Sequence, residues 1–259
     1  MKLFLQKALE AADASAQAIR QYYHGDFTVE LKPDQTPVTV ADREAEDIIR
    51  SILLAAFPEH GFFGEETGQT AQDAEYLWLV DPIDGTKSFV AGYGMFSTQI
   101  ALMHQGKLVL GVSCAPAHNE IAWAYSGGGA HLQDKRARVR DTGSIGEASI
   151  STGNIQSLAA SDRWEALGRI LAGANRTRGY GDYYHYHRLA AGQIDAVIES
   201  DVNILDVAAL AVIVREAGGV FTDLEGRPPS LGITSVLAAP PRLHALLLEM
   251  LNNRSSKAA

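Results

Sequence analysis

Asp81-Pro82-Ile83-Asp84-Gly85-Thr86 places two carboxylates three residues apart, directly after the apolar run Tyr76-Leu77-Trp78-Leu79-Val80. That run is rich in β-forming residues and predicts a buried strand. Pro82 removes the amide donor that the next ladder position needs, so we expect the strand to end and the chain to turn at Asp81. Two ionised carboxylates about 4 Å apart repel by roughly 4 kcal/mol at an effective dielectric of about 20. A divalent cation would reverse this repulsion, and oxygen ligands favour Mg²⁺ or Mn²⁺ over zinc.

Two further acidic segments are candidates for the same site. Phe62-Phe63-Gly64-Glu65-Glu66-Thr67-Gly68 holds two glutamates between glycines, and Asp206 opens an apolar helix that stops at Gly218-Gly219. Each acid also has an ordinary structural interpretation, as a solvated loop, a helix N-cap or a turn former. For any one acid alone, the structural interpretation is favoured. The occurrence of all these patterns in one chain favours a shared cation site.

Three acidic motifs follow one another in a fixed order: Gly64-Glu65-Glu66, then residues 81–86, then Asp206-Val207-Ala208-Ala209 with Glu216-Ala217-Gly218-Gly219 behind it. In these motifs the chain resembles the inositol monophosphatase family of metal-dependent, lithium-sensitive phosphatases. The resemblance runs from about the first helix to the last strand, with specific motifs at 38–42, 64–66, 81–86 and 199–219. It implies an α/β (α+β) fold, an α-β-α-β-α layered sandwich with the site between two lobes.

The resemblance implies a set of metal ligands, residue by residue. Glu65, Asp81 and the backbone carbonyl of Ile83 would hold one metal ion, and Asp81, Asp84 and Asp206 would hold a second. We expect two or three Mg²⁺ per subunit, with Mn²⁺ as an alternative. Four carboxylates and a doubly charged phosphate would repel one another without cations, so metal-free protein should bind substrate poorly.

The resemblance also implies the catalytic groups, with Glu65 counted among them. Thr86 matches the family's hydroxyl that works with an upstream aspartate, here Asp42 in Thr39-Val40-Ala41-Asp42, to orient a metal-bound water as nucleophile. On local sequence, Asp42 is equally well interpreted as the N-cap of the second helix, and the resemblance favours both roles. Gly85 has no side chain to keep phosphate from the backbone amides of Gly85 and Thr86.

Substrate choice depends on residues around this centre. Lys87 and Ser88 stand where inositol-type members usually carry a Thr-Asn pair, and residues 178–184 (RGYGDYY) are similar to the histidinol-phosphatase branch. That branch hydrolyses L-histidinol phosphate, whose leaving alcohol carries an ammonium and an imidazole. Glu199 matches the family's leaving-group contact and Asp182 would add a second negative group, which suits a cation. Asp182 is equally well interpreted as a helix cap, and Glu199 also fits a solvated strand end.

The leading hypothesis is a Mg²⁺-dependent phosphomonoesterase that converts L-histidinol phosphate to L-histidinol and phosphate in histidine biosynthesis. Inositol 1-phosphate and adenosine 3',5'-bisphosphate are alternative substrates, because branches of the family overlap in substrate use. An alternative outside the enzymes is a catalytically silent protein that binds a phosphate ligand on the same scaffold. The intact set of acids and hydroxyl speaks against this last hypothesis.

Composition excludes several other classes of protein. The chain has 259 residues, is 46% hydrophobic and carries a net charge of -9, which allows a large core and argues against a general binder of nucleic acid. No apolar run is long enough to cross a bilayer, and the single cysteine, Cys114, can form no internal disulfide. We expect a cytoplasmic protein that acts on a small phosphate monoester, without nucleic acid or membrane partners, and forms the family's homodimer.

Hydrophobic periodicity divides the chain into two parts around the polar segment 134–147. We predict an N-terminal lobe over 1–138, with two helices, the metal-binding loops and an antiparallel sheet, and a C-terminal α/β lobe over 139–259. The lobes should pack closely enough to count as one domain. Helices are predicted over 1–23, 41–57, 161–171, 183–191, 206–217 and 241–252, and strands over 76–80, 98–103, 107–114, 121–125, 130–132, 149–151, 194–198, 220–222 and 235–239.

Overall fold

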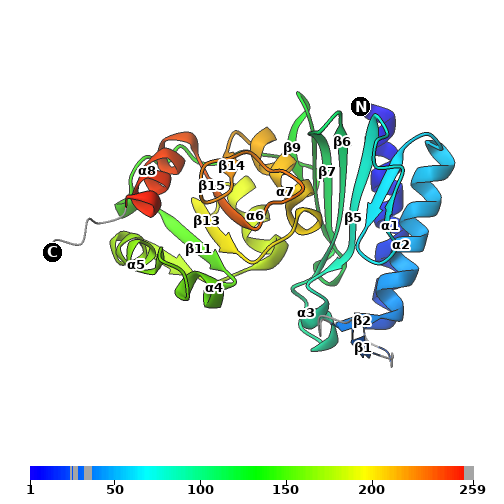
Figure 1. The fold of residues 1–259 in the computed structure, drawn as a ribbon, viewed down its shortest axis with the longest axis horizontal. Helices are drawn as coiled ribbons and strands as arrows, with labels where there is room; N and C mark the ends of the chain where they lie inside the picture. Colours follow the sequence, from blue (N-terminus) through cyan, green and yellow to red (C-terminus); the bar gives the residue numbers. More distant parts are fainter. Residues whose placement is uncertain (24, 26–28, 32–36, 254–259) are drawn as a thin grey trace.

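Helices α1 (Lys2–Tyr23) and α2 (Val40–Ala56) lie side by side and form the first layer (Figure 1). The structure is a computed structural model that describes residues 1–23, 25, 29–31 and 37–253. Apolar side chains recur at helical spacing on both helices, and Ile49 and Leu53 of α2 pack with Trp78 of the sheet beneath. Both helices were predicted from this spacing, and their bounds differ by a residue or less from the prediction.

The second layer is an eight-stranded sheet with the strand order β10-β9-β8-β7-β6-β5-β3-β4. The predicted antiparallel meander is confirmed, because β5 to β9 pair with their neighbours in chain order. β3 is parallel to β5, with Gly64 opposite Val80, so both strands end at the same edge of the sheet. The strands are β3 (Gly61–Gly64), β4 (Gly68–Thr70), β5 (Tyr76–Asp84), β6 (Ser97–His104), β7 (Lys107–Ala115), β8 (Glu120–Tyr125), β9 (Gly129–Leu132) and β10 (Lys135–Ala137).

The prediction that β5 stops at Asp81 is wrong, because the strand continues through Pro82 to Asp84. The pairing of β5 with β6 shifts register between Asp81 and Asp84, which is where a bulge takes the proline out of the ladder. The hydroxyl of Thr98 donates to the carbonyl oxygen of Pro82 at 2.8 Å. The bulge therefore accommodates the proline inside the sheet and changes the direction of the chain between the two aspartates.

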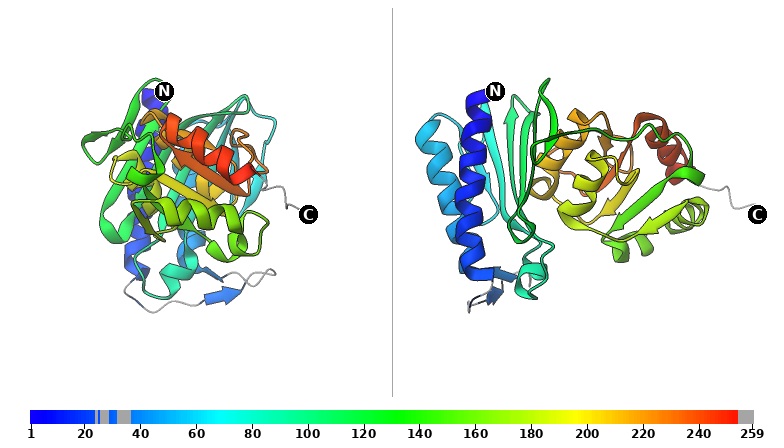
Figure 2. Two further views of the ribbon diagram at one scale, coloured as in Figure 1. Left: turned by 90° about the vertical axis from the view of Figure 1, so that its left-hand side faces the viewer. Right: turned by 180° about the vertical axis from the view of Figure 1, so that it is seen from behind.

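The third layer consists of α6 (Asp182–Ala190) and α7 (Ile204–Glu216), which lie between two sheets (Figure 2). α7 is apolar on nearly every side, as expected for a helix that is covered all round. It packs on β6, β7 and β8. At Gly111 of β7 a Cβ atom would lie 2.3 Å from the carbonyl oxygen of Ala209, so the glycine permits the close contact between helix and sheet.

The second sheet, with order β12-β11-β13-β15-β14, and its outer helices complete the α-β-α-β-α sandwich that was predicted (Figures 1 and 2). The first sheet ends at Ala137 and the second begins at Ser149, on either side of the polar segment. The division into lobes at 138/139 stays a prediction. The strands are β11 (Ser149–Gly153), β12 (Arg176–Arg178), β13 (Ala196–Ser200), β14 (Val220–Thr222) and β15 (Ser235–Ala239), and the helices are α4 (Ile155–Ala159), α5 (Trp164–Gly173) and α8 (Pro241–Asn252).

The short elements include several that the sequence did not predict. The helix expected over 161–171 begins later, at Trp164, and the separate helix α4 precedes it. The remaining short elements are β1 (Val29–Leu31), β2 (Pro37–Thr39), α3 (Thr86–Val90) and the 3₁₀ turns η1 (Pro116–His118) and η2 (Ile145–Glu147). Among the described residues, no helix combines the length and the apolar character needed to span a bilayer.

Candidate active site

Three of the predicted metal-binding aspartates meet between the two sheets. One carboxylate oxygen from each of Asp81, Asp84 and Asp206 lies within 4.8 Å of the other two. The first two residues flank the bulge of β5, and the third lies in the first turn of α7. A cluster of carboxylate oxygens is the donor set that hard divalent cations such as Mg²⁺ and Mn²⁺ prefer, so these residues fit such an ion.

The electrostatics of this cluster favour a bound cation. Burial, together with the charges of Glu65, Asp84 and Asp206, raises the pKa of Asp81 well above its usual value. Burial and the nearby acids raise the pKa of Asp84 in the same way. Burial raises the pKa of Asp206 to about 7, although hydrogen bonds from Asn203 oppose the shift. Carboxyl groups that hold protons this tightly in a shared site are typical of functional centres.

Glu65 joins the cluster from the end of β3. Its amide donates to the carbonyl oxygen of Val80 at 3.2 Å, which places it beside Asp81. Contact between the two side chains contributes to the raised pKa of Asp81. The group of oxygens within 4.8 Å contains the three aspartates and not Glu65, so the role of Glu65 as ligand of a first metal stays a prediction.

Asp42 and Thr86 meet next to the cluster, as their predicted pairing requires. The Thr86 hydroxyl lies 3.2 Å from Asp42 Oδ1 and 3.0 Å from the carbonyl oxygen of Ile83. The N-cap of α2 is Thr39 and not Asp42. Asp42 closes a capping box, because its Oδ2 accepts hydrogen bonds from Thr39 N at 2.7 Å and from Thr39 Oγ1 at 2.6 Å. Burial raises the pKa of Asp42, and the bonds from Thr39 and Thr86 oppose the shift.

Asp206 is likewise not an N-cap. α7 begins two residues earlier than predicted, at Ile204, and Asn203 is its cap. The backbone amide of Asn203 donates to Asp206 Oδ2 at 2.8 Å, and its side-chain amide donates to Oδ1 at 2.7 Å. The same carboxylate therefore holds the start of the helix and faces the other two aspartates.

Gly85 connects the bulge of β5 to the short helix α3. Its φ of +89° lies in the left-handed region that favours glycine, and a Cβ atom there would lie 2.8 Å from the carbonyl oxygen of Met95. Lys87 is exposed and Ser88 is partly buried on the same short helix. The structure thus explains the glycine by its backbone conformation and by the close approach of Met95, and the phosphate contact at the amides of Gly85 and Thr86 stays a prediction.

A second acidic group adjoins the metal cluster. Asp84, Asp182, Glu199 and Asp206 line a cavity of about 40 Å³. Asp182 is the first residue of α6 and follows the N-cap Gly181, so the interpretation of Asp182 as the helix cap is wrong. Burial and the charge of Glu199 raise the pKa of Asp182 to about 6. This acidic wall would attract a positively charged group.

Glu199 is buried and is not the solvated strand end that was one interpretation of the sequence. Its Oε2 accepts from the Tyr186 hydroxyl at 2.5 Å and lies 3.1 Å from His185 Nε2. His185 Nδ1 in turn lies 3.2 Å from the hydroxyl of Ser151. The sequence analysis assigned no site role to His185 or Tyr186; their one-turn spacing after Asp182 was the available signal.

The glycine triplet 127–129 lies at the turn between β8 and β9. Glu216 at the end of α7 accepts from the amides of Gly127 and Gly129, at 3.0 and 2.9 Å. A carboxylate of the protein itself thus occupies the amides that a phosphate would need.

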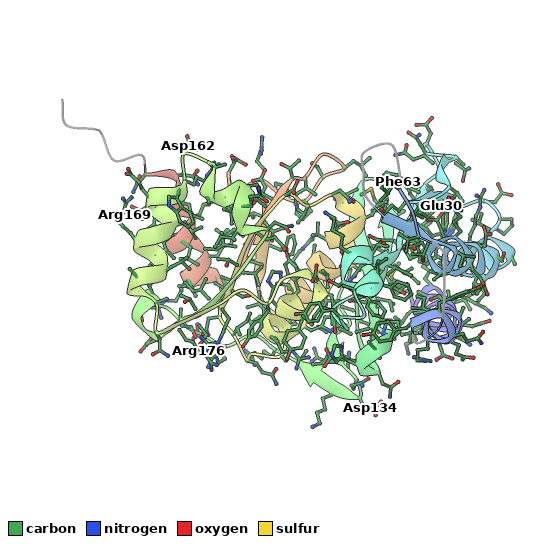
Figure 3. The ribbon with its side chains drawn as sticks, turned by 90° about the horizontal axis from the view of Figure 1, so that it is seen from below. Glu30, Phe63, Asp134, Asp162, Arg169 and Arg176 are labelled. Carbon is green, nitrogen blue, oxygen red and sulfur yellow. The ribbon has the colours of Figure 1, made fainter. Side chains whose placement is uncertain are left out.

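A larger cavity, of about 500 Å³, lies at the far end of the second sheet's outer layer, where its lining includes Asp162, Trp164 and Arg169. Figure 3 shows Asp162 and Arg169 at one end of the molecule, whereas Phe63, which precedes the Glu65 loop, lies in the other half. Charges of both signs line this cavity, and the aspartates of the cluster are not among them. The candidate active site is therefore the acidic cluster between the sheets and not this larger cavity.

Comparisons with known proteins identify the family to which the chain belongs. Residues 2–256 match the inositol monophosphatase family. A histidinol-phosphatase of Streptomyces coelicolor is 37% identical over 96% of this chain and 97% of its own length. An inositol-1-monophosphatase of Rhizobium meliloti is 36% identical over 87% of this chain and 86% of its own length. The crystal structure of the extragenic suppressor protein suhB from Bartonella henselae matches with a TM-score of 0.88 and 31% identity, covering 96% of this chain and 98% of that one. The chain belongs to the inositol monophosphatase family.

Proposed function

We propose that the protein is a Mg²⁺-dependent phosphomonoesterase that hydrolyses L-histidinol phosphate to L-histidinol and phosphate, in histidine biosynthesis. The observation that carries the proposal is the acidic wall of Asp182 and Glu199 beside a cluster of three aspartates. Family membership supports a phosphatase, and relatives named histidinol-phosphatase support this substrate. Relatives named inositol-1-monophosphatase make inositol 1-phosphate the second candidate.

The ligands of two or three Mg²⁺, or of Mn²⁺ in their place, would be the carboxylates already described and one carbonyl oxygen. When bound, the ions would offset the negative charge of the site and of the phosphate and would lower the pKa of a coordinated water. The residues that would hold them are Glu65, Asp81, Ile83 through its carbonyl oxygen, Asp84 and Asp206.

Thr86 would orient the attacking water. Its hydroxyl proton points to Asp42 or to the carbonyl of Ile83, so the lone pairs of the same oxygen are left to accept a hydrogen bond from water. Asp42 is held on its other oxygen by Thr39, which prevents the pair from rotating away. The phosphate would lie over the amides of Gly85 and Thr86, with Lys87 and Ser88 at the edge of the site.

The leaving alcohol would be selected by charge. Tyr186 and His185 both bind Oε2 of Glu199, which leaves Oε1 to accept a hydrogen bond from an ammonium group. Asp182 adds a second carboxylate on the same side of the cavity. A neutral polyol would leave these buried acids without a counter-charge, and the mismatch would favour histidinol phosphate.

The test is a comparison of phosphate release from histidinol phosphate, inositol 1-phosphate and adenosine 3',5'-bisphosphate at equal concentration with Mg²⁺. We expect the highest kcat/KM for histidinol phosphate and no release in the presence of a chelator. A preference for inositol 1-phosphate would reject the proposed substrate. No release from any of the three would favour the catalytically silent binding protein. The homodimer and the cytoplasmic location stay predictions from the sequence.

A further inference from the structure

Glu46 is a fully buried carboxylate on α2, one turn after Asp42. Burial of a carboxylate is costly unless hydrogen bonds compensate for the lost water. The Glu66 amide donates to Glu46 Oε2 and the Thr67 amide donates to Oε1, each at 2.8 Å. Both oxygens are therefore bound to the two peptide units that directly follow Glu65.

The loop that carries Glu65 is thus held from two sides. On the sheet side, the amide of Glu65 donates to the carbonyl oxygen of Val80, next to Asp81. On the helix side, the Glu46 carboxylate lies directly against Gly64, where a Cβ atom would come within 2.4 Å of Oε1. The loop has little freedom to move Glu65 away from the aspartates.

We propose that Glu46 is a positioning residue that holds Glu65 toward Asp81 and thereby sets the affinity of the acidic cluster for Mg²⁺. This inference rests on the proposed function in that it takes Glu65 as a metal ligand. Asp42 and Glu46 are four residues apart and so share one face of α2. One helix face would therefore position both the hydroxyl of Thr86 and the carboxylate of Glu65.

The substitution Glu46→Gln tests the inference. Glutamine has one carbonyl oxygen, and its NH₂ group would face one of the two backbone amides, so one hydrogen bond is lost and a donor meets a donor. We expect calorimetry to show Mg²⁺ binding that is weaker by about tenfold or more, the usual effect of removing a residue that orients a ligand. Glu44→Gln is the matched control, because it makes the same change on the exposed face of the same helix.

Gly64→Ala perturbs the same contact without changing the carboxylate. Its methyl group would displace Glu46, so the Mg²⁺ affinity should fall in the same direction. In both variants, thermal unfolding without metal reports folding, and raising the Mg²⁺ concentration should restore kcat for the substrate that the wild type hydrolyses. A purely structural defect would not be restored by Mg²⁺.

Three outcomes would overturn the inference. If Glu46→Gln folds and binds Mg²⁺ as tightly as the wild type and Glu44→Gln, Glu46 has no positioning role. If Glu46→Gln does not fold, unchanged Mg²⁺ affinity in Gly64→Ala excludes the positioning role as well. If the wild type itself takes up no Mg²⁺, the proposed function fails together with the inference, which distinguishes that failure from the other two.

Discussion

Asp206→Asn should stabilise the metal-free protein at about pH 8 and at the same time weaken its response to Mg²⁺. Burial beside other acids raises the pKa of Asp206 to about 7, whereas an unfolded chain has a value near 3.9. A carboxyl whose pKa is raised on folding destabilises the fold as pH rises above the unfolded value, and the cost is complete above the folded value. At about pH 8 this cost is at most about 4 kcal/mol, since one pKa unit corresponds to roughly 1.4 kcal/mol.

Two effects reduce the gain in stability that Asp206→Asn brings. Asparagine closes the capping box with Asn203 less well than the carboxylate does, which costs about 0.5 to 1 kcal/mol. The remaining acids of the cluster also relax when one charge is removed, so we expect a net gain of about 1 to 3 kcal/mol, or a rise in Tm of a few degrees. At about pH 5 the cost of the wild-type Asp206 is only about 1.5 kcal/mol, and the gain should nearly vanish.

The assay is thermal unfolding of wild type and Asp206→Asn at about pH 5 and pH 8, each with a chelator and with Mg²⁺. Metal-free wild type should lose stability between the two pH values, and Mg²⁺ should restore it. The variant should show a smaller loss and a smaller response to Mg²⁺, and it should lose phosphatase activity. A variant that is less stable than the wild type by the same amount at both pH values would refute the reasoning, because the acids would then not repel one another.

Three further substitutions test other parts of the site. Gly85→Ala forces a side chain into a left-handed backbone at a cost of about 1 to 2 kcal/mol and places it against the Met95 carbonyl. Steady-state kinetics should show a loss of kcat/KM of at least about tenfold. Unchanged kinetics would contradict the proposed contact of phosphate with the amides of Gly85 and Thr86. Thr86→Val removes the hydroxyl between Asp42 and Ile83 and should lower kcat by about 10² or more, while Thr86→Ser keeps most activity; equal rates for Val and Ser would reject the water-orienting role. Glu199→Gln should raise KM for histidinol phosphate by about tenfold and leave KM for inositol 1-phosphate nearly unchanged, and an equal effect on both substrates would show that charge does not select the alcohol.

The main helices and strands could be predicted from local patterns. α1, α2 and α8 follow from their apolar spacing, and the meander follows from alternation between turn residues. Some segments of three to five residues, among them β3, β12 and α4, carry too little periodicity and were missed. The stop of β5 at Asp81 was wrong because the rule for proline holds only in a regular ladder, and the chain uses a bulge instead.

The predictions for the site divide in a similar way. The kinds of residue in the candidate site were predicted from the motifs and the family resemblance. The roles of Asp42 and Asp206 in their helices were not predicted. Each closes a capping box with an N-cap three residues earlier, and the sequence alone did not show at which residue the helix begins. Glu46 and Tyr186 were missed altogether, since neither belongs to a motif and each acts through a contact that forms only on folding.

The amino-acid sequence by itself determined the local elements and the supply of hard oxygen ligands, because helical spacing, alternation and acidic motifs are properties of short segments. Only the tertiary structure decided that Asp81, Asp84 and Asp206 meet within 4.8 Å and that Glu46 faces the Glu65 loop. The physical reason is that these distances depend on the parallel pairing of β3 with β5 and on the packing of α7 and α2 against the sheet. Such contacts join residues far apart in the chain, and no local periodicity encodes them.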